Sequence, residues 1–420
     1  MNNLRSTPHD TGHNLVIDLE TSVKNRGDFA VGTMKASPYH PENKIVMYGS
    51  QIGNVIHARE DGNELLSSLT IATRLVGQNI KFDLLYLLTH HYSVLIRFLR
   101  TGGKIYDTQL AEYLLTGQED KMMPLGSSWK IDDKGNKVLS KEGLARRYGG
   151  TEKDDRIKEF WNAGTDTEDI PKDMLSEYLL DDVENTGIVY LHQMKLIDNL
   201  ELNALVDQSM EALLLTTFME WHGMHFDLDQ AANDATPLEI EQTDLIQDLK
   251  QQMAKRISDQ TGKYPLLTDL NPLSNKQVSL YLFGGTYDIV VDVEQLDPDT
   301  GEVILYKSGL KKGKPKTKKM KIGYDMTGTA SPLLDVEKKS HGWDTSNEVL
   351  QILKSDKYVK DFVVPLLRLR EVSKDLNTYY KGLVSLTWLT DNCIHGSINH
   401  TTTATGRTSS SNPNLQNITN

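Results

Sequence analysis

Cysteine is almost absent from this chain of 420 residues, which contains Cys393 alone. A single thiol excludes an intrachain disulfide framework and any zinc site built from several cysteines. A metal or catalytic site must therefore use oxygen and nitrogen ligands. The length itself predicts two or three domains.

Long apolar runs are also missing. No stretch approaches 18 consecutive apolar residues, and residues 1–13 lack a cationic start followed by an apolar core. These two absences argue against a membrane-spanning helix and a secretory leader. We therefore expect a cytoplasmic protein with no membrane partner.

The chain has no excess of positive charge. Its 46 lysines and arginines are outnumbered by 58 aspartates and glutamates, which gives a formal net charge of −12. Proteins that coat nucleic acid are usually basic, so a DNA contact here must be local. Eight lysines and no acidic residue lie between Lys307 and Lys321. This run fits a local DNA contact and equally fits a solvated loop.

The first half of the chain has the pattern of an α/β domain. Short segments rich in β-branched residues predict a three-stranded meander over residues 14–20, 29–36 and 44–49. Helical patterns then alternate with short apolar segments over residues 62–115, which indicates a mixed sheet. A helix over residues 171–197, opened by Pro171 at a position that favours proline, is expected to close the domain.

Strand signals become scarce after residue 199, and apolar residues recur at helical spacing. We expect a helix to restart at Pro237 with Thr236 as its cap. Residues 286–340 interrupt the helical pattern with glycine, lysine and aspartate, and indicate an insertion that contains a hairpin. Short strands and loops are expected from about residue 384 onward.

Two carboxylates share one face of the first predicted strand. The period of two places Val16, Asp18 and Glu20 on one face and Leu15 and Ile17 on the other. Adjacent like charges are unfavourable unless a cation lies between them, and a divalent ion with oxygen ligands meets that need. An Asp-x-Glu pair by itself is more often a strand end that meets water.

Two further pairs at helical spacing can join this site. Asn79 and Asp83 are four residues apart at a predicted helix start, and Tyr178 and Asp182 are four apart within the helix over 171–197. Each pair would share one helix face. An aspartate in a first turn also serves the helix dipole, and a Tyr-x-x-x-Asp pair alone also fits a core tyrosine beside a surface acid.

Together these three motifs resemble the proofreading 3′→5′ exonuclease domain of family A DNA polymerases. Glu177 stands five residues before Asp182, where the histidine branch of these exonucleases has histidine, so the tyrosine branch is indicated. The resemblance implies a ribonuclease H-like α/β fold with a mixed sheet. Asp107 also matches an acid that recurs near the metals in this branch, and it equally fits an N-cap for the following helix.

The resemblance continues along most of the chain. Three segments look like parts of the polymerase thumb region. The segment leading into the thumb corresponds to residues 219–227, a motif within it to residues 270–283, and the segment after it to residues 344–350. The most specific stretch, TATGRTSSSNPNLQNI at residues 403–418, is similar to the opening of the polymerase palm.

The resemblance implies a catalytic site with two divalent ions, Mg²⁺ or Mn²⁺. Asp18, Glu20 and Asp182 would hold one ion, which lowers the pKa of a water molecule, and Asp18 with Asp83 would hold the second. Tyr178 would orient the water together with Glu20. The residues expected to bind DNA are Gln78, Asn79 and Phe82 for the frayed primer strand, Arg407 for the primer's minor groove, and Lys311, Lys312, Lys318 and Lys319 in the lysine run.

The expected organisation is an exonuclease domain over residues 1–198, a helical thumb region over 199–385 with an insertion at about 286–340, and a palm start over 386–420. The family continues from this point to the first polymerase aspartate and the fingers. We therefore expect a 3′→5′ exodeoxyribonuclease that releases nucleoside 5′-monophosphates and polymerises only with a separate palm and fingers chain.

This layout resembles the phage members of the family, which places the protein in the cytoplasm of a bacterial host. Expected partners are a single-stranded DNA 3′ end, primer-template duplex, the second polymerase chain, and a processivity or replisome protein at the insertion. Two alternatives stay open. One is a stand-alone tyrosine-branch exonuclease that trims RNA or DNA, and the other is a DNA-gripping polymerase scaffold with a vestigial nuclease site.

Overall fold

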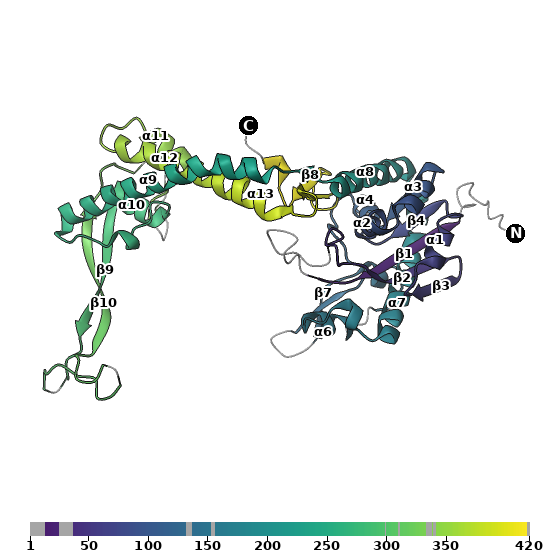
Figure 1. The fold of residues 1–420 in the computed structure, drawn as a ribbon, viewed down its shortest axis with the longest axis horizontal. Helices are drawn as coiled ribbons and strands as arrows, with labels where there is room; N and C mark the ends of the chain where they lie inside the picture. Colours follow the sequence, from purple (N-terminus) through teal and green to yellow (C-terminus); the bar gives the residue numbers. More distant parts are fainter. Residues whose placement is uncertain are drawn as a thin grey trace. The chain divides into compact units, whose positions relative to one another are not determined.

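The computed structural model in Figure 1 describes residues 13–24, 37–131, 137–152, 156–298, 300–309, 311–332, 338 and 342–417. The chain divides into two compact units. Unit 1 comprises Met1–Asp227 and Leu383–Asn420, and unit 2 comprises Leu228–Gly382. The strand expected over residues 29–36 lies outside the described residues.

Unit 1 is built on a five-stranded sheet in the order β3-β2-β1-β4-β5. Its strands are β1 (Asn14–Thr21), β2 (Ile45–Ile52), β3 (Val55–Arg59), β4 (Arg74–Gly77) and β5 (Lys104–Asp107). Neighbours are antiparallel from β3 to β1 and parallel from β1 to β5. The expected mixed sheet is therefore confirmed. The sequence pattern missed β3, because this edge strand has no fully buried residue.

Helices pack against this sheet. They are α1 (Asn63–Ser68), α2 (Lys81–His90), α3 (Tyr92–Arg100), α4 (Thr108–Leu115), α5 (Leu144–Arg147), α6 (Arg156–Asn162), α7 (Lys172–Asn199) and α8 (Asn203–His222). Figure 1 shows α7 below the sheet and α2 and α8 above it. The helix expected over 171–197 is confirmed as α7, which begins one residue after Pro171.

The approach of α7 to the sheet depends on a glycine. A Cβ added at Gly49 in β2 would lie 2.7 Å from Cγ2 of Val183 and 2.8 Å from Cγ of Leu179. Both side chains belong to the buried face of α7, and both pack in the same core as Leu15 and Ile17 of β1. Only a residue without a side chain lets α7 lie this close to β2.

Residues after Leu383 fold onto unit 1 as short strands, as expected. β8 (Met224–His225), β11 (Thr387–Trp388) and β12 (Cys393–Ile394) form one small sheet in the order β11-β12-β8. β13 (Ser397–Asn399) and β14 (Ser409–Ser411) form an antiparallel hairpin. A further two-stranded sheet joins β6 (Ser128–Ile131) and β7 (Lys137–Lys141), and α13 (Lys381–Leu386) leads into the terminal strands.

Unit 2 is mainly helical and carries one long β-hairpin. Its elements are α9 (Leu228–Thr261), α10 (Asn275–Phe283), β9 (Gly284–Glu294), β10 (Thr317–Thr327), α11 (Asn347–Leu353), α12 (Lys360–Asp375) and a π-helical turn (Leu376–Tyr380). β9 and β10 form an antiparallel hairpin in the region of the expected insertion. Leu249, Val278, Leu350 and Leu366 lie in the core of this unit.

The helix restart expected at Pro237 is wrong. α9 continues through this residue, and the Thr236 hydroxyl donates to the carbonyl of Ala232 at 2.8 Å instead of capping a new helix. The surrounding stretch is largely exposed. Water can therefore hydrate the backbone carbonyl that the missing proline N–H leaves without a partner.

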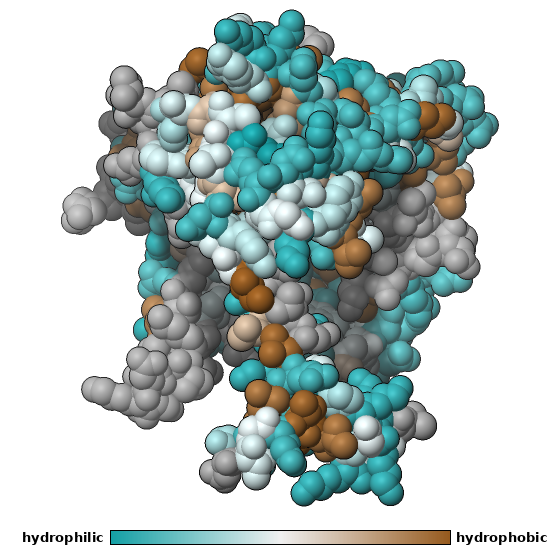
Figure 2. All heavy atoms as spheres, turned by 90° about the vertical axis from the view of Figure 1, so that its left-hand side faces the viewer, coloured by the Kyte–Doolittle hydropathy of each residue, from teal (hydrophilic) through white to brown (hydrophobic). Residues whose placement is uncertain are grey.

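Figure 2 looks toward the side of unit 2, where a mainly hydrophilic surface is interrupted by brown patches. Exposed apolar side chains in the hairpin region include Leu296, Leu305 and Met320. Within the described residues, every helix falls short of the length and apolarity that crossing a membrane requires.

Candidate functional site

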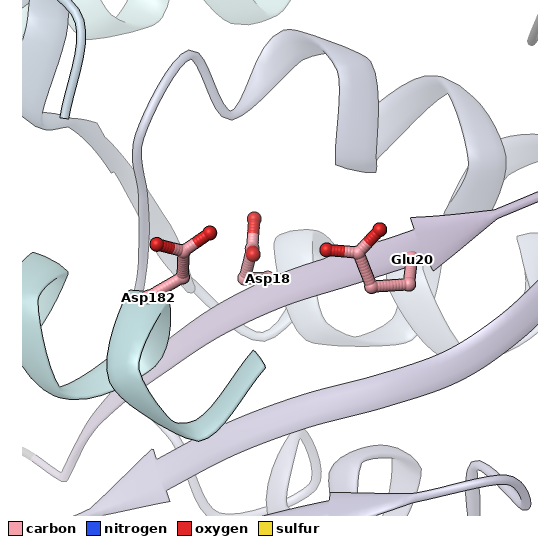
Figure 3. Close-up of side chains that lie close together, drawn as sticks. All are labelled: Asp18, Glu20 and Asp182. Atoms are coloured by element: carbon pink, nitrogen blue, oxygen red, sulfur yellow. The ribbon is translucent and has the colours of Figure 1, made fainter. Parts of the chain in front are cut away.

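Three carboxylates from two elements meet at the middle of unit 1. Oxygen atoms of Asp18, Glu20 and Asp182 all lie within 4.8 Å of one another. Figure 3 shows Asp18 and Glu20 projecting from β1 toward Asp182 on α7. Glu20 and Asp182 are buried and Asp18 is half-buried. Three clustered carboxylates supply the oxygen ligands that Mg²⁺, Mn²⁺ and Ca²⁺ prefer.

The local structure explains how these residues meet. Asp18 pairs with Gly49 across β1 and β2, and Gly49 is the residue that lets α7 approach the sheet. Asp182 stands directly before Val183, which packs against Gly49. The close packing of α7 at this one position therefore brings Asp182 to Asp18.

Asp83 lies next to this group. Its carboxylate is 2% exposed and accepts a hydrogen bond from the backbone N–H of Leu19 at 3.0 Å. Burial raises the pKa of Asp83 well above its ordinary value, and the negative charges of Asp18 and Glu20 raise it further. A cation at this place would offset that repulsion, so the residues fit a divalent ion.

Tyr178 is buried on the same face of α7 as Asp182, one turn earlier, which confirms the predicted helical spacing. Its ring packs edge-on against Trp161, with ring centroids 6.0 Å apart and planes at 85°. The indole N–H of Trp161 donates to the hydroxyl of Thr167 at 3.1 Å. Sequence reasoning missed Trp161, because its contact with Tyr178 spans the turn between α6 and α7.

Asn79 does not lie on the helix that carries Asp83. It precedes the N-cap residue of α2, Ile80, and has a positive φ of 54°. The helical spacing expected between Asn79 and Asp83 is therefore wrong. Asparagine tolerates this left-handed conformation better than most residues, because its short polar side chain can form local hydrogen bonds.

Asp107 holds the turn that contains Asn79. Its carboxylate accepts the N–H groups of Asn79 at 3.2 Å and Ile80 at 3.1 Å, and also those of Gln109 at 2.8 Å and Leu110 at 3.2 Å. The N-cap interpretation is confirmed by the last two bonds. Burial raises the pKa of Asp107 to about 6 despite these four donors.

The other residues expected to hold the primer strand differ in accessibility. Gln78 uses its amide within the protein, because it donates to the carbonyl of Met123 at 2.9 Å and accepts from the Thr108 hydroxyl. Phe82 is half-buried, and its ring lies 5.1 Å from that of Tyr86 between centroids.

The basic residues expected to bind DNA lie on other elements. Lys318 and Lys319 are exposed neighbours on β10, so strand alternation points them to opposite faces of the hairpin. Lys311 and Lys312 are exposed at its tip, where the Lys311 ammonium lies 5.9 Å from the centre of the Tyr306 ring. Arg407 is exposed in the loop between β13 and β14.

Sequence reasoning also missed a buried ion pair beside the start of α2. Lys81 Nζ lies 2.7 Å from Oε1 of Glu220 in α8, and the two side chains are 13% and 5% exposed. Lys81 also donates to the backbone carbonyl of Ile398 in β13, and the backbone N–H of Ile398 donates to the Glu220 carboxylate. The one sequence signal for this pair is Glu220, an acidic residue within the apolar stretch of α8. The signal does not identify Lys81 or Ile398 as partners, because both lie far from Glu220 in the sequence.

Comparison with known proteins adds sequence and fold relationships. Residues 320–420 match the model of DNA polymerase family A. The chain is 41% identical over 83 residues to DNA polymerase I of Bacillus subtilis (strain 168), which covers 20% of this chain and 9% of that protein. It is 27% identical over 349 residues to DNA polymerase I of Synechocystis sp. (strain ATCC 27184 / PCC 6803 / Kazusa), which covers 82% of this chain and 27% of that protein.

Among solved structures, the chain is similar to the POL domain of Pol1 from M. smegmatis in complex with DNA primer-template and dNTP. The TM-score is 0.53 at 18% sequence identity, and the alignment covers 98% of this chain and 53% of that chain. The chain thus spans only part of the length of the proteins that it matches. The chain is thus similar to the family A DNA polymerases over residues 320–420, to DNA polymerase I proteins in sequence, and to a polymerase domain in fold.

Proposed function

We propose that unit 1 is a divalent-metal-dependent 3′→5′ exonuclease that removes nucleotides from a single-stranded DNA end. The observation that carries this proposal is the meeting of Asp18, Glu20 and Asp182 within 4.8 Å, from a strand and a helix far apart in the sequence. The mixed sheet, with α7 packed along β1, β2 and β3, supports the ribonuclease H-like fold expected for this activity.

In this proposal the carboxylates hold two divalent ions. Asp18, Glu20 and Asp182 would hold one Mg²⁺ or Mn²⁺ ion, and Asp18 with Asp83 a second. Bound there, the ions would activate a water molecule and stabilise the leaving 3′ oxygen. The backbone N–H of Leu19 fixes the Asp83 carboxylate beside β1.

Tyr178 is the protein group proposed to orient the attacking water, together with Glu20. The Trp161 ring packs against the Tyr178 ring and restricts its position. Tyr178 thus acts through a hydroxyl group held by packing, and it holds no metal in this scheme. Its role differs from that of Asp182 one turn away on α7.

The single strand would reach this centre along the start of α2. Phe82 offers a half-buried aromatic ring directly before Asp83, and base stacking on such rings is tolerant of sequence. Asn79 is exposed in the turn that Asp107 holds. Gln78 supports the same turn from within the protein.

We further propose that the chain works in DNA replication as part of a family A polymerase, with primer-template duplex as a partner. The match of residues 320–420 and the primer-template complex of the M. smegmatis neighbour support this context. In it, Arg407, which is exposed between β13 and β14, contacts the primer's minor groove. The lysines of the hairpin would contact DNA, and the hairpin region is also a candidate site for a processivity or replisome protein.

A direct experiment tests direction and substrate. The purified chain is incubated with Mg²⁺ and with matched single-stranded DNA and RNA oligonucleotides labelled at the 5′ end. The proposal predicts a ladder that shortens from the 3′ end of DNA and releases nucleoside 5′-monophosphates. Glu184→Ala, an exposed change on α7 close to Asp182, serves as the matched control and should retain this activity.

The alternatives give different results. Faster degradation of RNA than of DNA would favour a stand-alone RNA-trimming enzyme of the same branch. Tight DNA binding without hydrolysis in either Mg²⁺ or Mn²⁺ would favour a scaffold with a vestigial nuclease site.

A further inference from the structure

Two lysines and a glutamate meet just beyond the end of β1. Lys24 stands four residues after Glu20, and Lys44 directly precedes β2. Both ammonium groups contact Glu168, which lies in the 3₁₀ turn Thr167–Asp169 before α7. Lys24 Nζ is 2.6 Å from Oε1 of Glu168, and Lys44 Nζ is 2.7 Å from Oε2. Each carboxylate oxygen of Glu168 therefore binds one lysine.

The backbone that carries the two lysines is fixed by buried polar groups. The side-chain oxygen of Asn43 accepts the backbone N–H of Lys24 at 3.0 Å, and the Ser22 hydroxyl accepts that of Lys44 at 3.0 Å. Ser22 also donates to Asn43, and both side chains are buried. Glu168 thus meets a pair of cations whose backbone is already held in place.

Asp166 connects the same turn to the end of β1 a second time. Its carboxylate accepts the backbone N–H of Glu168 at 3.2 Å and that of Val23 at 3.4 Å, and it lies 3.6 Å from Lys24 Nζ. The hydrogen bonds from Lys24 and Lys44 lower the pKa of Glu168 to about 2, so this carboxylate is ionised at neutral pH. A network of several charges contributes more to holding a segment than an isolated surface ion pair does.

The turn also carries a residue that faces the interior. Thr167 is fully buried, and its hydroxyl accepts the indole N–H of Trp161 at 3.1 Å. The Trp161 ring packs edge-on against Tyr178, with ring centroids 6.0 Å apart. A continuous series of contacts therefore runs from Glu168 through Thr167 and Trp161 to Tyr178.

We propose that Glu168 is a positioning residue, which fixes the place of the Tyr178 hydroxyl for hydrolysis. It acts from the turn before α7, through Thr167 and Trp161, and holds neither metal ion nor substrate in this scheme. The proposal rests on the exonuclease function given above. It adds a second connection between β1, which carries two of the proposed metal ligands, and α7, which carries the third.

Kinetics of three variants test this role. Glu168→Gln keeps the size of the side chain and removes its charge, and Thr167→Val removes the hydroxyl that binds Trp161. For both we expect kcat on single-stranded DNA to fall by about tenfold while KM and the affinity for Mn²⁺ stay unchanged, because the water is misplaced but the metal ligands are intact. Asp169→Asn, an exposed change in the same turn, is the matched control and should retain the wild-type kcat.

Protein that already carries Tyr178→Phe separates positioning from general support of the fold. If Glu168 acts through the Tyr178 hydroxyl, adding Glu168→Gln to this protein should slow hydrolysis no further. An independent effect on the fold would instead multiply the two losses. Thermal unfolding verifies that each variant is folded.

A spectroscopic measurement follows the same contacts without hydrolysis. The chain has five tryptophans, so protein labelled with 5-fluorotryptophan gives five fluorine NMR signals, and Trp161→Phe identifies the signal of Trp161. Glu168→Gln and Thr167→Val should shift this signal and leave the others in place. Asp169→Asn should leave all of them unchanged.

The outcomes separate this proposal from the proposed function. An unchanged kcat in folded Glu168→Gln protein, or an equal loss of kcat with and without the Tyr178 hydroxyl, would overturn the positioning role. If wild-type protein hydrolyses no DNA, the exonuclease proposal fails, and the fluorine spectra test the contacts alone. A shifted Trp161 signal in Glu168→Gln then supports the control of Trp161 by Glu168, and an unmoved signal overturns it.

Discussion

Gly49 of β2 lies against Val183 of α7, so closely that a Cβ at position 49 would be 2.7 Å from Cγ2 of that valine. Gly49 is also the β-sheet partner of Asp18, and Val183 follows Asp182 in the chain. One close contact between a strand and a helix thus sets the distance between two of the proposed metal ligands.

Replacing Gly49 with alanine should therefore affect both stability and hydrolysis. The added methyl group must push α7 away from β2, and overpacking of this kind costs about 1–3 kcal/mol. Asp182 would move with the helix, so exonuclease activity should fall as well. Urea unfolding and the rate of nucleotide release measure the two effects. Wild-type values for both would show that α7 can shift without disturbing the site.

The burial of Asp83 predicts how the folding stability of the protein changes with pH when no divalent ion is bound. Burial and the charges of Asp18 and Glu20 raise its pKa above that of the unfolded chain. Its favourable contribution to folding is then present below the unfolded pKa and is lost as pH rises through the folded pKa. Thermal unfolding in EDTA should show this loss, and Asp83→Asn should reduce it.

Divalent ions supply the control for this prediction. Mg²⁺ binds the ionised carboxylates, so the stabilisation it adds should increase with pH over the same range. A loss of stability on raising the pH that is identical in wild type and Asp83→Asn would contradict the assignment.

Tyr178 and Asp182 should differ in their effects although they share a helix face. Tyr178→Phe removes a hydroxyl group that orients water, so weak hydrolysis should remain. Trp161→Ala loosens the same ring and should lower kcat more than it raises KM. Loss of all activity in Tyr178→Phe would point to a different role, and Glu184→Ala again serves as the neutral change on α7.

The hairpin lysines should not contribute equally to duplex binding. Lys318 and Lys319 point to opposite faces of β10, so one face of the hairpin can present only one of them to DNA. Removing a single lysine–phosphate interaction should reduce the slope of log Kd against log salt by roughly 0.9. We expect one of the single variants Lys318→Ala and Lys319→Ala to reduce this slope and the other to leave it unchanged.

The Lys311→Ala and Lys312→Ala changes at the hairpin tip extend this experiment. They should reduce the slope further if the tip also meets the duplex. An unaltered slope in all four variants would mean that the lysine run is solvated or is reserved for a protein partner.

The parts of the site that could be predicted from the sequence lie within single regular elements. Asp18 and Glu20 share a face because they are two apart on a strand, and Tyr178 and Asp182 because they are four apart in a helix. Their periodicity does not depend on distant residues. The prediction of a mixed sheet succeeded for the same reason, since β1, β2 and α7 each have their own apolar pattern, whereas the edge strand β3 has none and was missed.

Most of the errors arise where distant contacts decide the local structure, and one arises from exposure to solvent. Asn79 leaves the helical conformation because Asp107, in another strand, binds the turn before α2. Glu220 and Lys81 pair across α8 and α2, and neither helix shows this in its own sequence. α9 passes through Pro237 because its exposed side tolerates a missing hydrogen bond.

The most direct test of the central claim is the Mg²⁺-dependent rate at which nucleoside 5′-monophosphate leaves the 3′ end of single-stranded DNA, compared between wild type, Asp18→Ala and Asp182→Ala. Thermal unfolding without metal should show both variants folded, because each removes one of several clustered negative charges. The account predicts that both variants lose at least roughly 100-fold in rate while Glu184→Ala does not. Rates within about tenfold of wild type in both carboxylate variants would contradict it, because loss of a metal ligand should slow hydrolysis far more than this if the centre depends on these residues.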